Sequence, residues 1–274
     1  MVLDLYPDAR GRALNFVHLF FALGAFVSPI AIGALVDAGV PWQVVLAGPG
    51  PVAFLLAVPH LVTDLGDRRA VLGGQATTHV GRLWLAPPIL ALGIGIGLYV
   101  AAEMGVSSWL VRFLAGSPLT TATTALGLFW GGLMLGRLVS ARFADRFDHI
   151  ALAMAAAIAA ALALTGAILV PVVPVQIALF ALVGFAYAPI YPLIVAVAGE
   201  RYPDRASAVS GILTAAGVFG SVIYPPLMGL MSVSVGLSAA MAGTVVICLG
   251  CAGAVAVAGR LRLPDAATEG ATAA

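Results

Sequence analysis

The chain has 274 residues, of which 62% are hydrophobic and only 9% are charged. Its mean hydropathy is +1.08, whereas soluble globular proteins carry about 25% charged residues. Because so few charges cannot solvate a water-exposed surface of this size, the composition excludes a soluble protein and indicates a polytopic membrane protein. The net charge of +1 provides no basic surface for nucleic acid, and all thirteen cationic residues are Arg.

Apolar runs long enough to cross a bilayer, which takes about 20 residues per helix, follow one another along the chain. Eight are expected to be membrane-spanning helices: 14–36, 42–62, 83–114, 119–141, 150–170, 174–199, 206–231 and 235–259. The connecting segments are rich in Gly, Pro and Asp, which are typical of turns. The first run is too long for a signal peptide and lacks a small-residue cleavage site. The sequence therefore predicts an all-α membrane protein with eight transmembrane helices.

The arginines predict the orientation of these helices. Twelve of the thirteen fall on one side of an eight-span topology, and only Arg112 falls on the other. The positive-inside bias assigns the arginine-rich side to the cytoplasm. We therefore expect a multi-pass protein of the plasma membrane, in a bacterium the inner membrane, with both termini in the cytoplasm.

An internal repeat indicates how the helices are grouped. Residues 6–33 align without a gap on residues 202–229. The identical pairs are Tyr6 and Tyr202, Pro7 and Pro203, Asp8 and Asp204, Gly24 and Gly220, Pro29 and Pro225, and Gly33 and Gly229. Both copies begin on the cytoplasmic side and lie six spans apart, so the repeating unit is six helices in parallel orientation. Parallel six-helix halves are a property of carriers of the major facilitator type.

The repeat also predicts the domain organisation. Residues 1–62 are expected to be the last two helices of an N-terminal half, and residues 63–82 a cytoplasmic linker. Residues 83–262 are expected to be a complete six-helix C-terminal half, followed by a disordered cytoplasmic tail at 263–274. On this interpretation four further helices would precede Met1.

Several stretches carry a family resemblance. They are residues 10–18 (RGRALNFVH), 24–29 (GAFVSP), 99–111 (YVAAEMGVSSWLV), 127–137 (GLFWGGLMLGR), 184–192 (GFAYAPIYP) and 217–225 (GVFGSVIYP). Together they resemble the fucose permease-like and other sugar permease-like branches of the major facilitator superfamily. The resemblance implies twelve helices, alternating access, coupling to protons and a small solute such as a sugar or related polar metabolite as substrate. It implies no cofactor and no metal.

Glu103 is the only acidic residue inside a predicted span. A carboxylate at the bilayer centre costs about 3 kcal/mol, so such a residue usually faces protein or a water-filled cavity. Its position predicts the outer third of the membrane, and Tyr99 lies four residues earlier on the same helix face. The functional interpretation is a gate or a solute-binding acid that takes up a proton. The alternative is an interfacial carboxylate bonded to Ser107 or to a neighbouring helix.

Three glycines, Gly93, Gly95 and Gly97, alternate through the same span. Glycine weakens a helix by about 1 kcal/mol relative to Ala, and it also permits close helix packing. Because a 32-residue run is too long for one straight span, we favour a broken, gating helix over plain tight packing.

A cytoplasmic signature follows the fourth span. Its members are Gly136, Arg137, Arg142, Asp145 and Arg146. They resemble the superfamily signature between the second and third helices of a half and predict a conformational latch. Asp145 could approach the start of the span at 206, while the arginines could pair with Asp148, Glu200 or Asp204. The alternative is simple positive-inside anchoring.

Aromatic residues with polar tips fall well inside the predicted spans. They are Trp130, Tyr187, Tyr191 and Tyr224. Such residues could stack on a sugar ring or pack between helices. Asn15 and His18 could line an inner vestibule or make helix contacts. No role is predicted for His60, His79 or His149, and Cys248 and Cys251 are expected to be small packing residues.

Other functional classes lack their motifs. The sequence has no H-E-x-x-H, no G-x-S-x-G, no pair of intramembrane aspartates and no glycine-rich phosphate loop. We therefore expect no enzyme and no metal site. Two alternatives to a carrier for a sugar or related polar metabolite stay open: a truncated remnant that does not transport, and a drug or metabolite efflux carrier of the same superfamily.

Overall fold

The computed structural model describes residues 10–62 and 83–261, with the side chains of 20–58 and of 83–261 apart from Asp145 and Asp204. Its helices are α2 (Arg10–Asp37), α3 (Trp42–Ala47), α4 (Pro49–Val62), η1 (Leu83–Leu85), α6 (Pro87–Phe113), α7 (Leu119–Phe143), η2 (Ala144–Arg146), α8 (His149–Leu169), α9 (Val173–Tyr187), α10 (Ile190–Arg201), η3 (Pro203–Arg205), α11 (Ala206–Ser234) and α12 (Leu237–Arg260). The predicted linker at 63–82 and the predicted tail at 263–274 lie outside the described residues.

Seven helices within these ranges are long and apolar enough to cross a membrane. They are Phe20–Asp37, Pro87–Phe113, Leu119–Phe143, His149–Leu169, Val173–Arg201, Ala206–Ser234 and Leu237–Arg260. Their bounds lie within a few residues of seven of the runs predicted from hydropathy. The predicted all-α architecture with repeated membrane crossings is therefore confirmed.

The eighth predicted span, 42–62, differs from the others. It is divided between α3 and α4 at Gly48, and its described apolar part, Trp42–Val58, is shorter than the seven long helices. The break follows from the sequence Gly48-Pro49-Gly50-Pro51. A proline inside a helix removes one backbone N–H and clashes with the carbonyl one turn earlier, and glycine adds conformational freedom.

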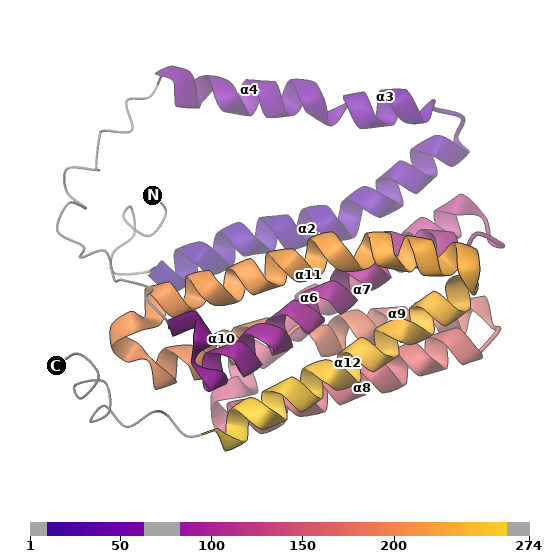
Figure 1. The fold of residues 1–274 in the computed structure, drawn as a ribbon. Coiled ribbons are helices and arrows are strands. Elements are labelled where there is room, and N and C mark those ends of the chain that lie inside the picture. The colour runs from indigo at the N-terminus through magenta and orange to yellow at the C-terminus, as the bar shows by residue number, and fades with distance from the viewer. Residues whose placement is uncertain (1–9, 63–82, 262–274) are drawn as a thin grey trace, which may run out of the picture.

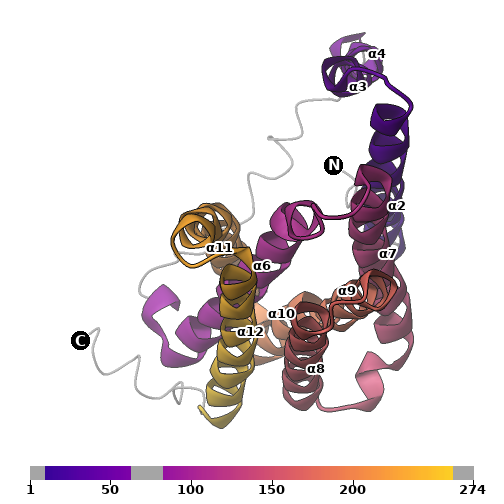
Figure 2. The same cartoon turned by 90° about the vertical axis from the view of Figure 1, so that its right-hand side faces the viewer.

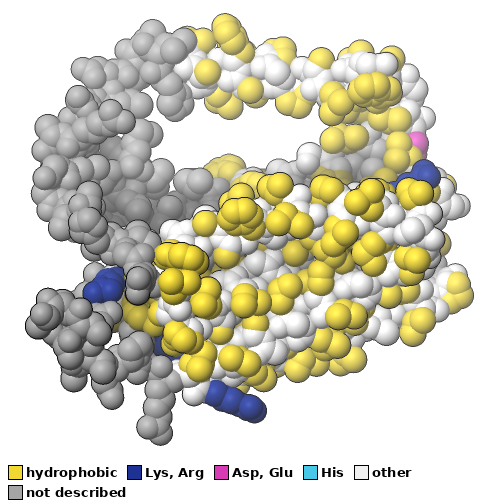
Figure 3. Space-filling view, viewed as in Figure 1, with side chains coloured by type: hydrophobic (Ala, Val, Ile, Leu, Met, Phe, Trp, Pro, Cys, Tyr) yellow, Lys and Arg dark blue, Asp and Glu magenta, His cyan; other side chains and the backbone are white. Residues whose placement is uncertain are grey.

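The helices from α6 to α12 form one bundle, and the first helices lie at its side (Figure 1). Helix α2 packs along α7, which Figure 2 shows from the end of the bundle. Helix α3 contacts α2 and α4, and α3 and α4 stand away from the bundle, with an open gap visible in Figure 3. Among the described residues, the main pairing of the opening helices with the bundle is that of α2 with α7.

Helix α6 corrects one sequence expectation. It runs without interruption from Pro87 to Phe113, and the excess length of the apolar run forms the separate turn η1. The prediction of a broken, gating helix is therefore wrong. The glycines serve close packing instead, because Gly97 faces the backbone of α11.

Two helix crossings bring backbone against backbone. A Cβ at Gly220 of α11 would overlap the carbonyl oxygen of Gly97 on α6. At the crossing of α7 and α9, a Cβ at Gly132 or Gly184 would likewise overlap a carbonyl oxygen of the opposite helix. In a bilayer, where helices gain no hydrophobic attraction for one another, such close van der Waals contact is a main source of association.

The surface and the core are both suited to lipid. Large apolar side chains such as Phe219 and Leu162 are more than 60% exposed, and Figure 3 shows hydrophobic side chains over the flank of the bundle with described arginines towards its ends. Apart from the Tyr202 hydroxyl, the buried polar side-chain atoms of the described residues have hydrogen-bond partners. Gln176 donates to the carbonyl oxygen of Ala167 at 3.1 Å, and the hydroxyl groups of Thr244 and Tyr224 lie 2.9 Å apart. Polar groups without water need such internal partners.

The crossing of α6 and α11 yields a paired test. Gly220→Ala forces a methyl group into the backbone of α6 and is expected to destabilise the fold by about 1–3 kcal/mol, the usual cost of overpacking. Gly211→Ala on the same helix has open space around its Cβ and is expected to be neutral or stabilising by up to about 1 kcal/mol. Thermal unfolding of both variants in detergent measures the difference, and equal melting temperatures would contradict the close crossing.

Candidate functional site

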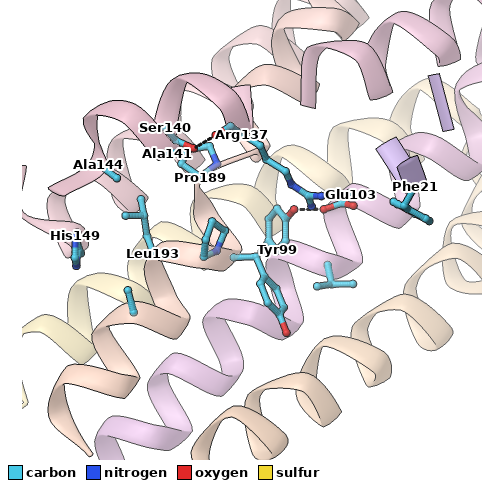
Figure 4. Close-up of a pocket in the computed structure, with 14 residues that line it drawn as sticks. Phe21, Tyr99, Glu103, Arg137, Ser140, Ala141, Ala144, His149, Pro189 and Leu193 are labelled. Carbon is cyan, nitrogen blue, oxygen red and sulfur yellow. Dashed lines mark hydrogen bonds between the residues drawn. The ribbon is translucent and has the colours of Figure 1, made fainter. Parts of the chain in front are cut away.

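The structure contains a cavity of about 670 Å³ where α6, α7, α8 and α10 meet. Its polar lining comprises Tyr99, Glu103, Arg137, Ser140, His149 and Tyr191, and its apolar lining includes Phe21 of α2 and Pro189, Pro192 and Leu193 of the α9–α10 region. Figure 4 shows most of these side chains around the hollow. The volume is within the range typical of small-molecule sites, about 300–1,000 Å³.

The cavity depends on a break between α9 and α10. Helix α9 ends at Tyr187 and α10 begins at Ile190, with Ala188 and Pro189 between them. Pro189 has no N–H to continue the helical hydrogen bonds, so the chain is redirected there. The redirection brings Pro189 and Tyr191 into the cavity wall.

Glu103 and Tyr99 form the polar centre of this wall. Both are buried, at 7% and 2% exposure. They lie one helical turn apart on α6, and the Tyr99 hydroxyl donates a hydrogen bond to the Glu103 carboxylate. The shared helix face expected from their four-residue spacing is therefore observed. The interfacial alternative involving Ser107 is not, because the Ser107 hydroxyl donates to the carbonyl oxygen of Met104.

Arg137 lines the same cavity as Glu103 and Tyr99. Its guanidinium points towards both groups (Figure 4). Arg137 lies six residues before the end of α7, which is about 9 Å along the helix axis. From that depth, the long Arg137 side chain reaches the cavity more readily than it reaches the loops beyond the helix end.

The other latch residues have different described surroundings. Gly136 packs against α9, where a Cβ would overlap the carbonyl oxygen of Phe185. Arg142 and Arg146 are exposed, and the Arg146 guanidinium lies 5.2 Å above the ring of Phe143. The side chain of Asp145 is outside the described residues, so the latch stays a prediction.

The predicted interior aromatics divide into two groups. Tyr191 lines the cavity, and its hydroxyl oxygen lies 3.2 Å from that of Thr214. Tyr187 is fully buried behind Tyr99, with ring centroids 5.8 Å apart and planes at 85°.

The other two aromatics lie elsewhere. Trp130 packs edge-on against Phe21 of α2, with ring centroids 6.3 Å apart. Tyr224 bonds to Thr244 in a separate cluster between α11 and α12. The side chains of Asn15 and His18 are outside the described residues.

His149 and Ser140 also line the cavity, although no role was predicted for either of them. The Nδ1 atom of His149 lies 3.1 Å from Oε1 of Glu200 on α10. The position of His149 at the start of α8 does not indicate that this helix start adjoins a cavity. Among the described residues, no three His, Cys, Asp or Glu side chains come close enough to hold a metal ion.

At the opposite end of α7, a second polar contact joins it to α2. The Asp37 carboxylate accepts hydrogen bonds from the backbone N–H of Thr120, at 3.0 Å, and from the Thr120 hydroxyl. Thr120 lies in the first turn of α7, where backbone N–H groups lack helical partners and favour an anion. Below this contact, the side chain of Thr123 packs against Gly33.

Comparison with known proteins identifies the family. The sequence matches the model of the Major Facilitator Superfamily over residues 1–209 and again over residues 92–274. The chain therefore belongs to the Major Facilitator Superfamily, as the resemblance predicted.

Two relatives are glucose/galactose transporters of Brucella abortus, from strains 9-941 and 2308. Each is 27% identical over 256 residues, an alignment that covers 84% of this chain and 59% of the relative. A putative glucose/galactose transporter of Helicobacter pylori strain J99 is 29% identical over 144 residues, which cover 51% of this chain and 34% of the relative. The chain thus spans about 59% of the length of the Brucella relatives.

Two solved structures share the fold. Both are of a bacterial homolog to the human lysosomal transporter Spinster in an inward-facing conformation. The occupied form gives a TM-score of 0.67 at 17% identity over 97% of this chain and 74% of that chain. The unoccupied form gives 0.64 at 16% identity over 93% and 71%. This likeness confirms the helix bundle expected for the superfamily.

The cavity can be tested by cysteine labelling on α10. Ala196 lines the cavity, whereas Ala198, two residues further, is 2% exposed. We expect Ala196→Cys to react with a hydrophilic maleimide at least tenfold faster than Ala198→Cys, because the reagent needs water to reach the thiol. The native Cys248 and Cys251 are at most 2% exposed and provide a low background. Equal rates for the two variants, followed by mass spectrometry, would contradict the cavity.

Proposed function

We propose that this chain forms part of a secondary carrier that moves a small polyhydroxylated solute of the hexose class across the membrane by alternating access. The observation that carries the proposal is the cavity that exposes Glu103, Tyr99 and Arg137 inside an otherwise apolar bundle. Ionisable groups at such depth are costly and usually mark a solute or ion pathway. The names of the Brucella and Helicobacter relatives support glucose or galactose as solutes.

The chemistry of the cavity suits a sugar. Tyr191 and Tyr99 supply aromatic rings, 6.4 Å apart between centroids, and the faces of such rings suit the C–H surface of a pyranose. Glu103 and Arg137 supply an acceptor and several donors for hydroxyl groups. Apolar residues such as Leu193 exclude water from the rest of the wall.

Alternating access requires one end of the cavity to be open while the other is closed. Asp37 joins α2 to α7 at one end, through Thr120, and the cavity extends towards the other end, where Ala144 and His149 line it. The positive-inside bias supports a cytoplasmic location for that second end, because most arginines belong to it. On this proposal the structure corresponds to an inward-open state, with both termini in the cytoplasm.

The domain organisation is part of the proposal. Helices α6 to α12 pack with one another as one half, and α2 belongs to a second half whose contact with the first is the α2–α7 pairing. The two halves of such carriers can rock relative to each other around a central cavity. Since the chain spans 59% of the length of its Brucella relatives, transport is proposed for the intact carrier that contains it.

The coupling ion proposed is a proton, with Glu103 as its site. In the described conformation Arg137 and Glu103 line the same cavity. Protonation would accompany a state in which the guanidinium has moved away. Arg137 is in turn proposed as a cavity residue, while Arg142 and Arg146 anchor the cytoplasmic end.

Glu103→Gln tests the proposed site. We expect hexose uptake by the intact carrier, driven by an inward proton gradient in proteoliposomes, to fall at least tenfold, because the amide can neither carry a proton nor balance Arg137. Glu200→Gln, which changes a carboxylate outside the cavity lining at 63% exposure, is the matched control and is expected to stay within about twofold of wild type. Unchanged uptake by Glu103→Gln at normal expression rejects the site. No hexose uptake by the wild-type carrier rejects the function and favours a remnant or an efflux carrier.

Asp37→Ala tests the closed end. A helix-capping side chain contributes about 1 kcal/mol, so its loss is expected to raise the population in which α2 and α7 separate by about fivefold. The reporter is Thr123→Cys, at a position 6% exposed beneath α2, whose rate of maleimide labelling should rise by that factor. Asp148→Ala removes a similar cap from α8, where Asp148 accepts from the N–H of Ala151 at 2.7 Å, and should leave the rate unchanged. An equal effect of the two substitutions would contradict a specific role for Asp37.

A further inference from the structure

Two opposite charges face each other in the cavity wall from different helices. Glu103 comes from α6 and Arg137 from α7, and both line the cavity (Figure 4). We propose that Glu103 and Arg137 form a paired-charge subsite that selects neutral polyhydroxylated solutes and rejects both sugar acids and amino sugars. The inference rests on the proposed function, and it names the feature that determines which solute charge the site accepts.

The carboxylate of the pair is held in place. Tyr99 donates its hydroxyl hydrogen to Glu103, and the Tyr99 ring is wedged edge-on against Tyr187. The Tyr187 hydroxyl is in turn 3.2 Å from Sγ of Cys248 on α12. Tyr99 donates its only hydroxyl hydrogen to Glu103 and so occupies one acceptor position of the carboxylate. The remaining lone pairs of the carboxylate can accept from Arg137 and from a solute hydroxyl.

The guanidinium benefits from this carboxylate. An arginine stays protonated in proteins, and a cation partly removed from water is more stable near an anion. Among the described residues that line the cavity, Glu103 is the one carboxylate. The remaining ionisable group of the lining, His149, has Nδ1 3.1 Å from Glu200, a carboxylate that is 63% exposed and outside the cavity lining.

Among the described residues that line the cavity, the charges of the Glu103 carboxylate and the Arg137 guanidinium therefore cancel. A solute that carries its own charge would add an unbalanced charge among partly desolvated groups, which is unfavourable for either sign. A neutral diol avoids that penalty. One hydroxyl can donate to Glu103 while a neighbouring hydroxyl accepts from Arg137, and both hydrogen bonds are strengthened by the charge of the protein group.

Tyr191 adds an acceptor to the same wall. The Thr214 hydroxyl donates to the carbonyl oxygen of Ser210 at 2.8 Å, so the contact of 3.2 Å between the hydroxyl groups of Tyr191 and Thr214 uses the Tyr191 hydrogen. The Tyr191 oxygen is left with lone pairs for a hydroxyl donor. A solute with several hydroxyl groups satisfies this acceptor as well.

Charge selectivity can be measured with three probes of similar size: D-glucose, D-glucuronate and protonated D-glucosamine. Affinities are measured by calorimetry on the purified intact carrier at neutral pH. Wild type is expected to bind glucose at least tenfold more tightly than either charged sugar. Glu103→Gln leaves Arg137 unbalanced and should shift the preference towards glucuronate at least tenfold. Arg137→Gln should shift it at least tenfold towards glucosamine.

Two further variants keep the test decisive. The double variant E103Q/R137Q is neutral again and should return towards the wild-type preference for glucose. Arg112→Gln, on α6 but absent from the cavity lining, should change none of the ratios. If the single variants fail to fold, Glu103→Asp and Arg137→Lys, which keep both charges, must retain the wild-type order of affinities.

The outcomes separate the two proposals. A wild-type carrier that binds none of the three sugars contradicts the proposed function itself. A wild-type carrier that binds glucose, with variants that weaken all three sugars equally, overturns the paired-charge subsite and leaves a merely structural role for both residues. Wild-type binding of glucuronate or glucosamine as tight as that of glucose also overturns it.

Discussion

A carboxylate and a guanidinium inside a bundle that otherwise faces lipid place the strongest constraint on this molecule. Each charge alone would be expensive at that depth, and the proposed pairing offsets part of that cost. Glu103 and Arg137 come from neighbouring helices and line the same cavity.

The apolar part of the bundle makes the arrangement possible. Gly97 and Gly220 bring α6 against α11, and Gly132 and Gly184 bring α7 against α9. The two helices that carry the charges, α6 and α7, are therefore each packed closely against a neighbouring helix. Close backbone contact of this kind leaves little freedom for the helix to rotate. By contrast, the main contact of α2 with the bundle is its pairing with α7. We propose that this boundary opens and closes.

Hydropathy predicted most of the fold. Seven spans were placed to within a few residues because lipid imposes a strong and simple length requirement. Two details of the prediction were wrong for local reasons. Gly48-Pro49 divides the second predicted span into two helices. The excess length of the third predicted span forms the separate turn η1, so that α6 itself is unbroken.

The candidate site was predictable only in part. Glu103 was detectable because a carboxylate within an apolar run is rare, and Tyr99 because i and i+4 share a helix face. Arg137 was detected as a signature residue but grouped with the loop beyond it, since the sequence does not reveal how far into the bundle a long side chain reaches. His149 gave no signal at all, because its position in the cavity wall depends on the packing of α8 against α10.

The pairing of Glu103 with Arg137 is the central claim, and a double-mutant cycle tests it most directly. The free energy of unfolding of the intact carrier in mixed micelles is measured for wild type, Glu103→Gln, Arg137→Gln and the double variant. Paired charges predict that the double variant is less destabilised than the sum of the single variants by at least about 1 kcal/mol. Effects that add to within about 0.5 kcal/mol would contradict the pairing and with it the account of the cavity.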